Sequence, residues 1–194
     1  MSSKVNIAIF ASGQGSNARN IVNYFEGHPI IQVTLLLSNR LQSGIPDISK
    51  ENNIPFNIFT REEFYHTDEV WKNLDAHHID FIVLAGFLWL VPEAMIQRYP
   101  EKIINIHPAL LPKFGGKGMF GMNVHQAVKA QNEPQTGITI HLVNEEYDKG
   151  RVLFQATTIV AETDSPEDIA HKVHELEYQH FPKVIEEYVL GFEK

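Results

Sequence analysis

Residues 5–17 read VNIAIFASGQGSN, an apolar run that leads directly into a loop containing Gly13 and Gly15. Apolar side chains then recur at helical spacing over residues 18–25, so this stretch predicts a strand, a glycine loop and a helix. Glycines let the backbone turn tightly, and the N-terminus of a following helix favours an anion. The loop therefore predicts a phosphate-binding site, unless it is a plain turn whose glycines serve packing.

The next hundred or so residues continue this alternation of apolar runs and helical segments. Expected strands cover residues 33–37, 54–59, 81–85 and 103–106, and expected helices cover residues 45–52, 61–77 and 92–99. Strands separated by helices of this length indicate βαβ units and a parallel sheet.

The second half of the chain has a different pattern. A glycine-rich loop over residues 108–121 precedes a short expected helix, residues 123–130. Two strand-like runs, residues 137–143 and 152–160, are joined by a polar turn and predict an antiparallel addition to the sheet. Ser165, followed by a proline and two acids, predicts the N-cap of a last helix. We therefore predict an α/β fold with a Rossmann-like, doubly wound, mostly parallel sheet and an antiparallel C-terminal addition.

Length and composition narrow the class of protein. The chain has 194 residues and no cysteine, so we expect one domain over residues 1–194 and exclude disulfides, thiolate zinc sites and cysteine nucleophiles. Lys and Arg number 16 against 24 Asp and Glu, and the resulting net charge of −8 disfavours nucleic-acid binding. The apolar runs are far shorter than the ~20 residues of a membrane span, and the first residues do not resemble a signal peptide. We expect a cytoplasmic enzyme or binding domain with neither nucleic acid nor membrane as a partner.

A second candidate site lies in residues 104–112, which read INIHPALLP. Asn105 and His107 are two residues apart at the end of an expected strand, so both side chains lie on the same face of the sheet. Open α/β sheets bind ligands at the carboxyl ends of their strands, and histidine carries protons near neutral pH. These features indicate either an acid–base site or a structural histidine.

Asp148 lies in the polar turn of residues 144–150, where an ordinary turn acid is the other interpretation. If Asp148 reaches His107, its carboxylate favours the imidazolium form and raises the pKa of the histidine. No His-Glu-x-x-His motif occurs in the sequence, and we expect no metal.

The glycine loop also fits Gly-x-Gly-x-x-Ala through Ala18, a loose form of the dinucleotide fingerprint. Arg40, at the end of the second expected strand, could suit the 2′-phosphate of NADP. An NADP-binding reductase is therefore a hypothesis from a different class, although it leaves Asn105, His107 and Asp148 without a role.

The glycine loop, the segment with Asn105 and His107, and the turn with Asp148 occur in this order along the chain. Together they resemble the folate-dependent formyltransferases. The resemblance covers nearly the whole chain and is carried by residues 11–17 (ASGQGSN), 84–87 (LAGF), 105–112 (NIHPALLP) and 148–150 (DKG), followed by Gln155. The Asn-x-His-Pro-x-Leu-Leu-Pro segment is specific to the superfamily. The Gly-x-Gly-Ser-Asn loop points to those members that formylate 5-phosphoribosylglycinamide (GAR) in purine biosynthesis.

The resemblance implies that the formyl group of 10-formyltetrahydrofolate, a co-substrate, is transferred to the amine of GAR without a metal. Asn105 and protonated His107 would stabilise the oxyanion of a tetrahedral intermediate. Asp148 would keep His107 charged and help to move the proton that the amine loses. The phosphate-binding half would cover about residues 1–100, and the folate-binding and catalytic half about residues 101–194.

The resemblance also implies which residues bind the two substrates. Those expected to bind GAR are Gly13, Gly15, Ser16 and Asn17 around the phosphate, and Glu177 at the sugar or amine. Those expected to bind the folate are Arg61, Leu88, Trp89, Leu90, Val91 and Asn105.

Two features depart from the common family pattern. Trp89 stands where the family commonly has arginine, and the loop of residues 114–122 is longer and richer in glycine. An N-formyltransferase that acts on a sugar nucleotide and a non-catalytic binding protein on the same fold are the remaining alternatives. We expect no further domain at either end, and either a monomer or a homodimer.

Overall fold

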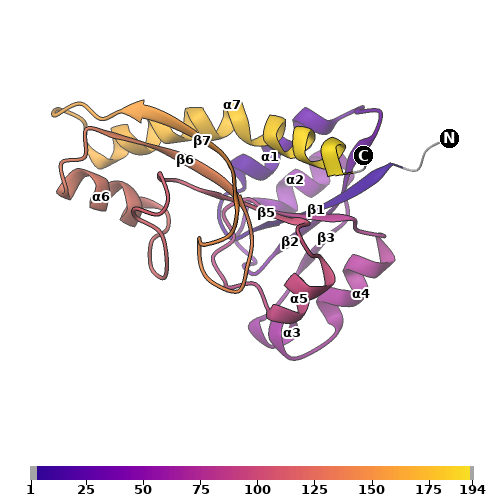
Figure 1. The fold of residues 1–194 in the computed structure, drawn as a ribbon. Helices are drawn as coiled ribbons and strands as arrows, with labels where there is room; N and C mark the ends of the chain where they lie inside the picture. The colour runs from indigo at the N-terminus through magenta and orange to yellow at the C-terminus, as the bar shows by residue number, and fades with distance from the viewer. Residues whose placement is uncertain (1–3, 193–194) are drawn as a thin grey trace. The chain divides into compact units, whose positions relative to one another are not determined.

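The computed structural model describes residues 4–192 and divides into two compact units, Met1–Ile104 and Asn105–Lys194 (Figure 1). The strand order is β3-β2-β1-β4-β5-β6-β7, and the boundary between the units falls inside β5 (Ile103–His107). Parallel pairing of β1 to β4 and antiparallel pairing of β6 with β7 confirm the expected α/β fold. The expectation of a single domain stays a prediction.

In the first unit, parallel strands form the centre of a doubly wound arrangement. The strands are β1 (Val5–Ala11), β2 (Ile31–Ser38), β3 (Phe56–Ile58) and β4 (Phe81–Leu84). β4 is buried along its whole length and β1 nearly so, as the continuous apolar runs predicted. The chain passes from β1 outward to β2 and β3, and then returns to the other side of β1 as β4. The carboxyl ends of β1 and β4 thus flank the topological switch point, where such sheets bind ligands.

The helices of the first unit follow the predicted positions with one correction. They are α1 (Ser16–Phe25), α2 (Ile45–Asn52), α3 (Arg61–Tyr65), α4 (Glu69–Ala76) and α5 (Glu93–Arg98). The expected single helix over residues 61–77 was wrong, because Thr67 interrupts it. The hydroxyl of Thr67 donates to the carbonyl of Glu63 and accepts from the N–H of Glu69, so it takes backbone partners that a continuous helix would use.

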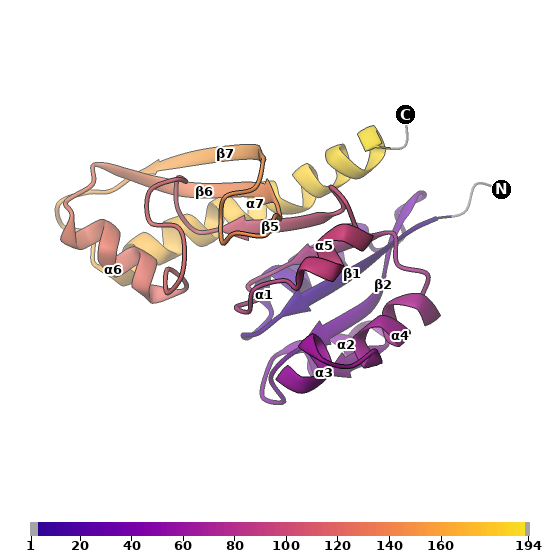
Figure 2. The same ribbon diagram turned by 60° about the horizontal axis from the view of Figure 1, so that its bottom comes forward.

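The second unit combines an antiparallel hairpin with two helices. β6 (Gln135–Leu142) pairs with β7 (Val152–Ile159), α7 (Pro166–Phe192) packs along both strands, and α6 (Met122–Ala130) packs against α7 (Figure 2). Ser165 caps α7 as predicted, since its Oγ accepts from the N–H of Asp168 at 3.1 Å. Within residues 4–192, no helix combines the length and the apolar character that a membrane crossing requires.

Candidate active site

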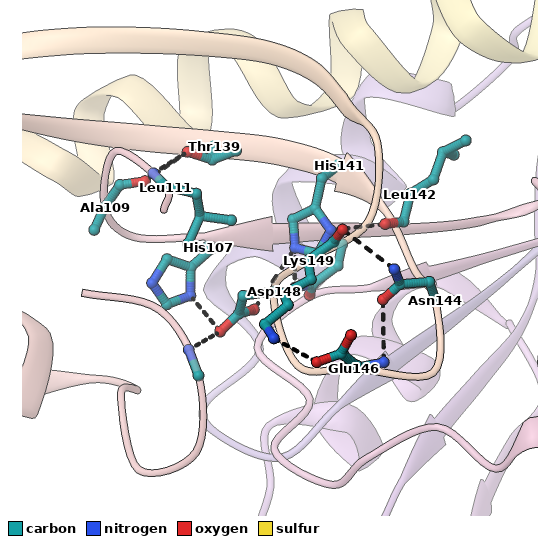
Figure 3. Close-up of polar contacts among 12 residues, drawn as sticks. His107, Ala109, Leu111, Thr139, His141, Leu142, Asn144, Glu146, Asp148 and Lys149 are labelled. Carbon is teal, nitrogen blue, oxygen red and sulfur yellow. Dashed lines mark hydrogen bonds and ion pairs between the residues drawn. The ribbon is translucent and has the colours of Figure 1, made fainter. Parts of the chain in front are cut away.

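A cluster of four polar side chains lies at the end of β5 and beside it, and Figure 3 shows three of them, His107, His141 and Asp148. Nδ1 of His107 is 3.5 Å from Oδ2 of Asp148, and Nε2 of His141 is 3.6 Å from Oδ1 of the same carboxylate. Nδ2 of Asn105 lies 3.0 Å from Nε2 of His141. Asp148, far away in sequence, is thus brought together with Asn105 and His107, and His141 connects them.

The polar turn places Asp148 because the turn folds tightly back onto β6. A Cβ atom at Gly150 would lie only 1.6 Å from the carbonyl oxygen of Leu142, so only glycine permits this approach. Asp148 itself has a φ of +57°, a left-handed conformation that Asp and Asn tolerate better than most residues. Strained conformations of this kind concentrate at functional sites.

The turn that follows His107 is fixed by one hydroxyl. Oγ1 of Thr139 donates to the carbonyl of Ala109 at 2.7 Å and accepts from the N–H of Leu111 at 3.0 Å. Nε2 of Gln155 donates to Oγ1 of Thr139 at 2.8 Å and to the carbonyl of Leu111 at 3.1 Å. These bonds hold the His107 end of β5 against the hairpin.

The start of the glycine-rich loop contacts both members of the His107–Asp148 pair. Nε2 of His107 donates to the carbonyl of Phe114 at 2.8 Å, because a carbonyl oxygen can only accept. The N–H of Gly116 donates to Oδ2 of Asp148 at 2.8 Å. With Phe114 facing Nε2 and Asp148 facing Nδ1, an imidazolium at His107 would have an acceptor for each N–H.

Burial dominates the electrostatics of His107. The imidazole is 4% exposed, and this burial lowers the pKa of His107 below the ordinary value of histidine. The carboxylate of Asp148 acts in the predicted direction and the carbonyl of Phe114 assists it, but neither overcomes burial. The sequence had suggested that Asp148 raises the pKa of His107 above its ordinary value. In the structure the pKa of His107 is lower than that value.

Asp148 stays ionised in the resting site. Burial raises the pKa of its carboxyl group, but the contact with His141, the charge that His107 can carry and the N–H of Gly116 outweigh that effect. The net result is that the pKa of Asp148 lies below the ordinary value of aspartate. The pair thus holds one fixed negative charge beside a buried imidazole.

His141 was missed from the sequence. It is 2% exposed, and its Nδ1 donates to the carbonyl of Leu142 at 2.8 Å, which leaves Nε2 to accept from Asn105. The signal that could have identified it is a histidine inside an expected strand that also contains Ile138, Ile140 and Leu142, because buried polar groups require specific partners.

The glycine loop of the first unit begins α1 directly. Gly15 occupies the N-cap with a φ of +76°, and a Cβ atom there would lie 2.8 Å from Cδ1 of Ile48. Ser16 starts the helix and Asn17 follows, 8% exposed, while Gly13 is exposed. Glycine is therefore required at residue 15, and the first amides of α1 lie beside it at the N-terminus of the helix dipole.

Ser12 joins this loop to the segment expected to bind folate. Its N–H donates to the carbonyl of Gly86 at 3.1 Å, and its buried Oγ accepts from the N–H of Leu88 at 3.1 Å. The loop after β1 and the segment after β4 are thus held together at the switch point of the first unit. Leu88, Trp89 and Leu90 are half-buried and Val91 is buried.

Arg61 lies beside the same segment. Its guanidinium carbon is 5.8 Å from the centre of the Trp89 ring and 5.5 Å from that of the Tyr65 ring. The hydroxyl of Tyr65 donates to the carbonyl of Leu90 at 2.7 Å. The structure therefore brings Arg61 together with the segment of residues 88–91 through aromatic contacts.

Glu177 lies on α7 in the second unit and is 5% exposed. Nδ1 of His174 donates to its Oε2 at 2.7 Å, which raises the pKa of His174 although partial burial opposes the shift. In the part of the chain that the structure describes, no group of three or more His, Asp and Glu side chains is arranged to hold a metal ion.

Fold and site define an α/β protein with a helix N-terminus suited to an anion and an Asn–His–Asp centre whose histidine is buried. The sequence profile of the family described as Formyl transferase matches residues 5–185, so the chain belongs to the formyl transferase family. This confirms the family that the motifs indicated.

Individual relatives agree with this assignment. The chain is 40% identical to the phosphoribosylglycinamide formyltransferase, chloroplastic, of Arabidopsis thaliana and covers 63% of that protein and 92% of its own length. The chain thus spans less than two thirds of the length of that relative. It is 33% identical to the phosphoribosylglycinamide formyltransferase of Haemophilus influenzae, covering 95% of this chain and 87% of the relative. The crystal structure of phosphoribosylglycinamide formyltransferase from Bacillus halodurans superposes with a TM-score of 0.83 at 31% identity, over 95% of this chain and 94% of that one.

Proposed function

We propose that the protein transfers the formyl group of 10-formyltetrahydrofolate to the amine of GAR, giving formyl-GAR and tetrahydrofolate in purine biosynthesis. The observation that carries the proposal is the contact of His107 with Asp148 at 3.5 Å beside Asn105, at the end of β5. Family membership supplies the reaction class, and the relatives named above suggest the acceptor.

The reaction assigns a step to each residue of the centre. The amine nitrogen of GAR bonds to the formyl carbon, and the formyl oxygen becomes an oxyanion. One N–H of the Asn105 amide goes to His141, and the second can be directed to this oxyanion. His107 would be the other donor through Nε2, which exchanges the carbonyl of Phe114 for the oxyanion while Nδ1 stays with Asp148. A negative charge that develops beside the ring favours the imidazolium and offsets the effect of burial. The carbon–nitrogen bond to the folate then breaks, and the leaving nitrogen takes up a proton while the amine loses one.

Asp148 is assigned to this proton transfer. Its carboxylate faces Nδ1 of His107 and can stabilise the positive charge when the ring holds the proton. The phosphate of GAR is assigned to Gly13, Gly15, Ser16 and Asn17, and its sugar or amine to Glu177. The folate is assigned to Arg61, residues 88–91 and Asn105. We propose a cytoplasmic monomer or homodimer, and no metal enters the reaction as proposed.

An absorbance assay of 10-formyltetrahydrofolate consumption, with and without GAR in metal-free buffer, tests the proposal. GAR-dependent turnover is the expected result. Turnover without GAR would indicate a deformylase, and activity only with sugar nucleotides would favour that alternative acceptor. His107→Ala and Asp148→Ala should each lower turnover by about a hundredfold or more in folded protein. Near-normal turnover in either variant would contradict its assigned role.

A further inference from the structure

Glu177 interrupts the apolar stripe of α7. The buried side chains before and after it at every fourth residue are Ile169, Val173 and Phe181, so Glu177 takes a position that the pattern gives to an apolar side chain. Leu176 and His180, also on α7, are only half-buried. A buried carboxylate destabilises a core unless it is paired, and Oε2 of Glu177 accepts from Nδ1 of His174 at 2.7 Å.

His125 brings a second buried polar group to the same region. It lies on α6, which packs against α7, and is 5% exposed. Its Nδ1 is fully buried and has no hydrogen-bond partner among residues 4–192. α6 packs against α7, the helix that carries Glu177 and His174, and the charges of Glu177, His174 and His107 each act on His125.

An unpaired buried nitrogen is unusual in a native protein, since nearly all buried polar atoms have a protein or water partner. A purely structural histidine would therefore be expected to bond both ring nitrogens. A hydroxyl group matches either tautomer of the ring, because it can both donate and accept. The carboxylate of Glu177 accepts hydrogen bonds, so the two side chains suit a ligand that presents hydroxyl groups.

We propose that His125 is a further substrate-contacting residue, whose Nδ1 binds a hydroxyl group of the acceptor's sugar beside Glu177. The inference rests on the proposed function, which supplies an acceptor with a ribose. It extends the site from α7 to α6 and gives His125 a role in selecting the acceptor and none in the formyl transfer itself.

Two amide substitutions separate a hydrogen-bonding role from a packing role. His125→Asn places a polar group near the position of Nδ1, whereas His125→Gln places it near Nε2. The binding of GAR, and of an analogue whose ribose lacks both hydroxyl groups, is measured by calorimetry for each protein. His171→Leu is the control, because His171 lies on α7 with a side chain that is 78% exposed.

Wild type and His171→Leu should prefer GAR to the analogue, and His125→Asn should keep most of that preference. His125→Gln should lose about tenfold of it, the effect of one hydrogen bond, while its affinity for the folate stays unchanged. An unaltered preference in folded His125→Gln would overturn the proposal.

A second measurement uses the wild-type chain alone, so it does not depend on the folding of a variant. With ¹⁵N-labelled histidine, the Nδ1 resonance of His125 should shift on addition of GAR and stay in place with the analogue. Equal shifts with both compounds would contradict the assignment of His125. If folded wild type bound neither compound, the proposed acceptor itself would be wrong.

Discussion

The side-chain amide of Asn105 donates to Nε2 of His141 at 3.0 Å, and His141 in turn lies 3.6 Å from Asp148. His141 thus contacts both the residue assigned to the oxyanion and the residue assigned to the proton. Because Nδ1 of His141 is committed to the carbonyl of Leu142, the ring orientation is fixed, and with it the amide of Asn105.

Replacing His141 with leucine should therefore lower kcat by about ten- to a hundredfold, as expected when a positioning partner is lost. The KM values should change much less, since His141 is not assigned to either substrate. His141→Gln, whose amide can replace Nε2, should recover part of the loss. Steady-state kinetics of the two variants check this, and equal kcat values for both would show that the hydrogen bond to Asn105 is unimportant.

The positions of Asn105 and His107 were predictable because alternation along a strand fixes which side chains share a face. Their contact with Asp148 was not predictable from spacing alone. It depends on the turn that closes at Gly150 and on the left-handed backbone of Asp148, which are tertiary features. The direction of the pKa shift at His107 depends on burial, and no local sequence pattern reports the burial of a single ring.

The parallel strands and most helices were predictable from apolar runs and caps, as Ser165 illustrates. Thr67 shows the limit of such patterns, since helical spacing on both sides concealed a hydroxyl that ends one helix and starts the next. The role proposed for His125 could not be predicted from the sequence either, because its unpaired Nδ1 can be recognised only when its surroundings are known.

Gly116→Ala should impair turnover by disturbing the loop that contacts Asp148. Gly116 has a φ of +93°, a conformation that alanine resists, and its N–H bonds the carboxylate at 2.8 Å. We expect kcat to fall about tenfold, which corresponds to ~1.4 kcal/mol of strain or displacement. Gly27→Ala is a matched control, because Gly27 also has a positive φ, +70°, and open space around its Cα. Equal kcat values for the two variants would contradict the role of the loop.

Acidification should destabilise the fold through His107. Because burial lowers its pKa, the unfolded chain takes up a proton at a higher pH than the folded chain does. Between the ordinary histidine value of about 6.5 and the lower folded value, the unfolded state binds more protons, so the free energy of unfolding falls as pH falls. The groups that act on the ring are Asp148, Phe114, His141 and Glu177.

Urea unfolding at about pH 7.5 and about pH 5.5 compares the wild type with His107→Gln; the wild type should lose more stability, by at most ~1.4 kcal/mol per pH unit. Asp148 remains ionised over this range, because its pKa lies below the ordinary aspartate value. Equal losses in the two proteins would mean that His107 takes up no extra proton on unfolding.

Trp89→Ala should weaken binding of the folate through Arg61. The guanidinium of Arg61 lies over the rings of Trp89 and Tyr65, and loss of one ring removes part of its support. The KM for 10-formyltetrahydrofolate should rise about threefold to tenfold, in line with one cation–π contact, while the KM for GAR stays the same. Trp71→Ala removes a similar contact, with Arg98 at 5.2 Å, and should leave both constants unchanged. If both tryptophan variants altered the two constants alike, Trp89 would have no specific role in the folate site.

Asn17→Ala should weaken the binding of GAR without slowing the formyl transfer. Asn17 lies in the first turn of α1, directly after the glycine loop, where the amide ends of the helix favour the phosphate. The loss of one hydrogen bond to a charged group should raise the KM for GAR about tenfold, with kcat almost unchanged. Asn23→Ala, on the exposed side of the same helix, tests for a general effect on α1. Because the reacting groups are assigned to other residues, a fall in kcat at constant KM would place Asn17 in the wrong step, and an unchanged KM would remove it from the phosphate site.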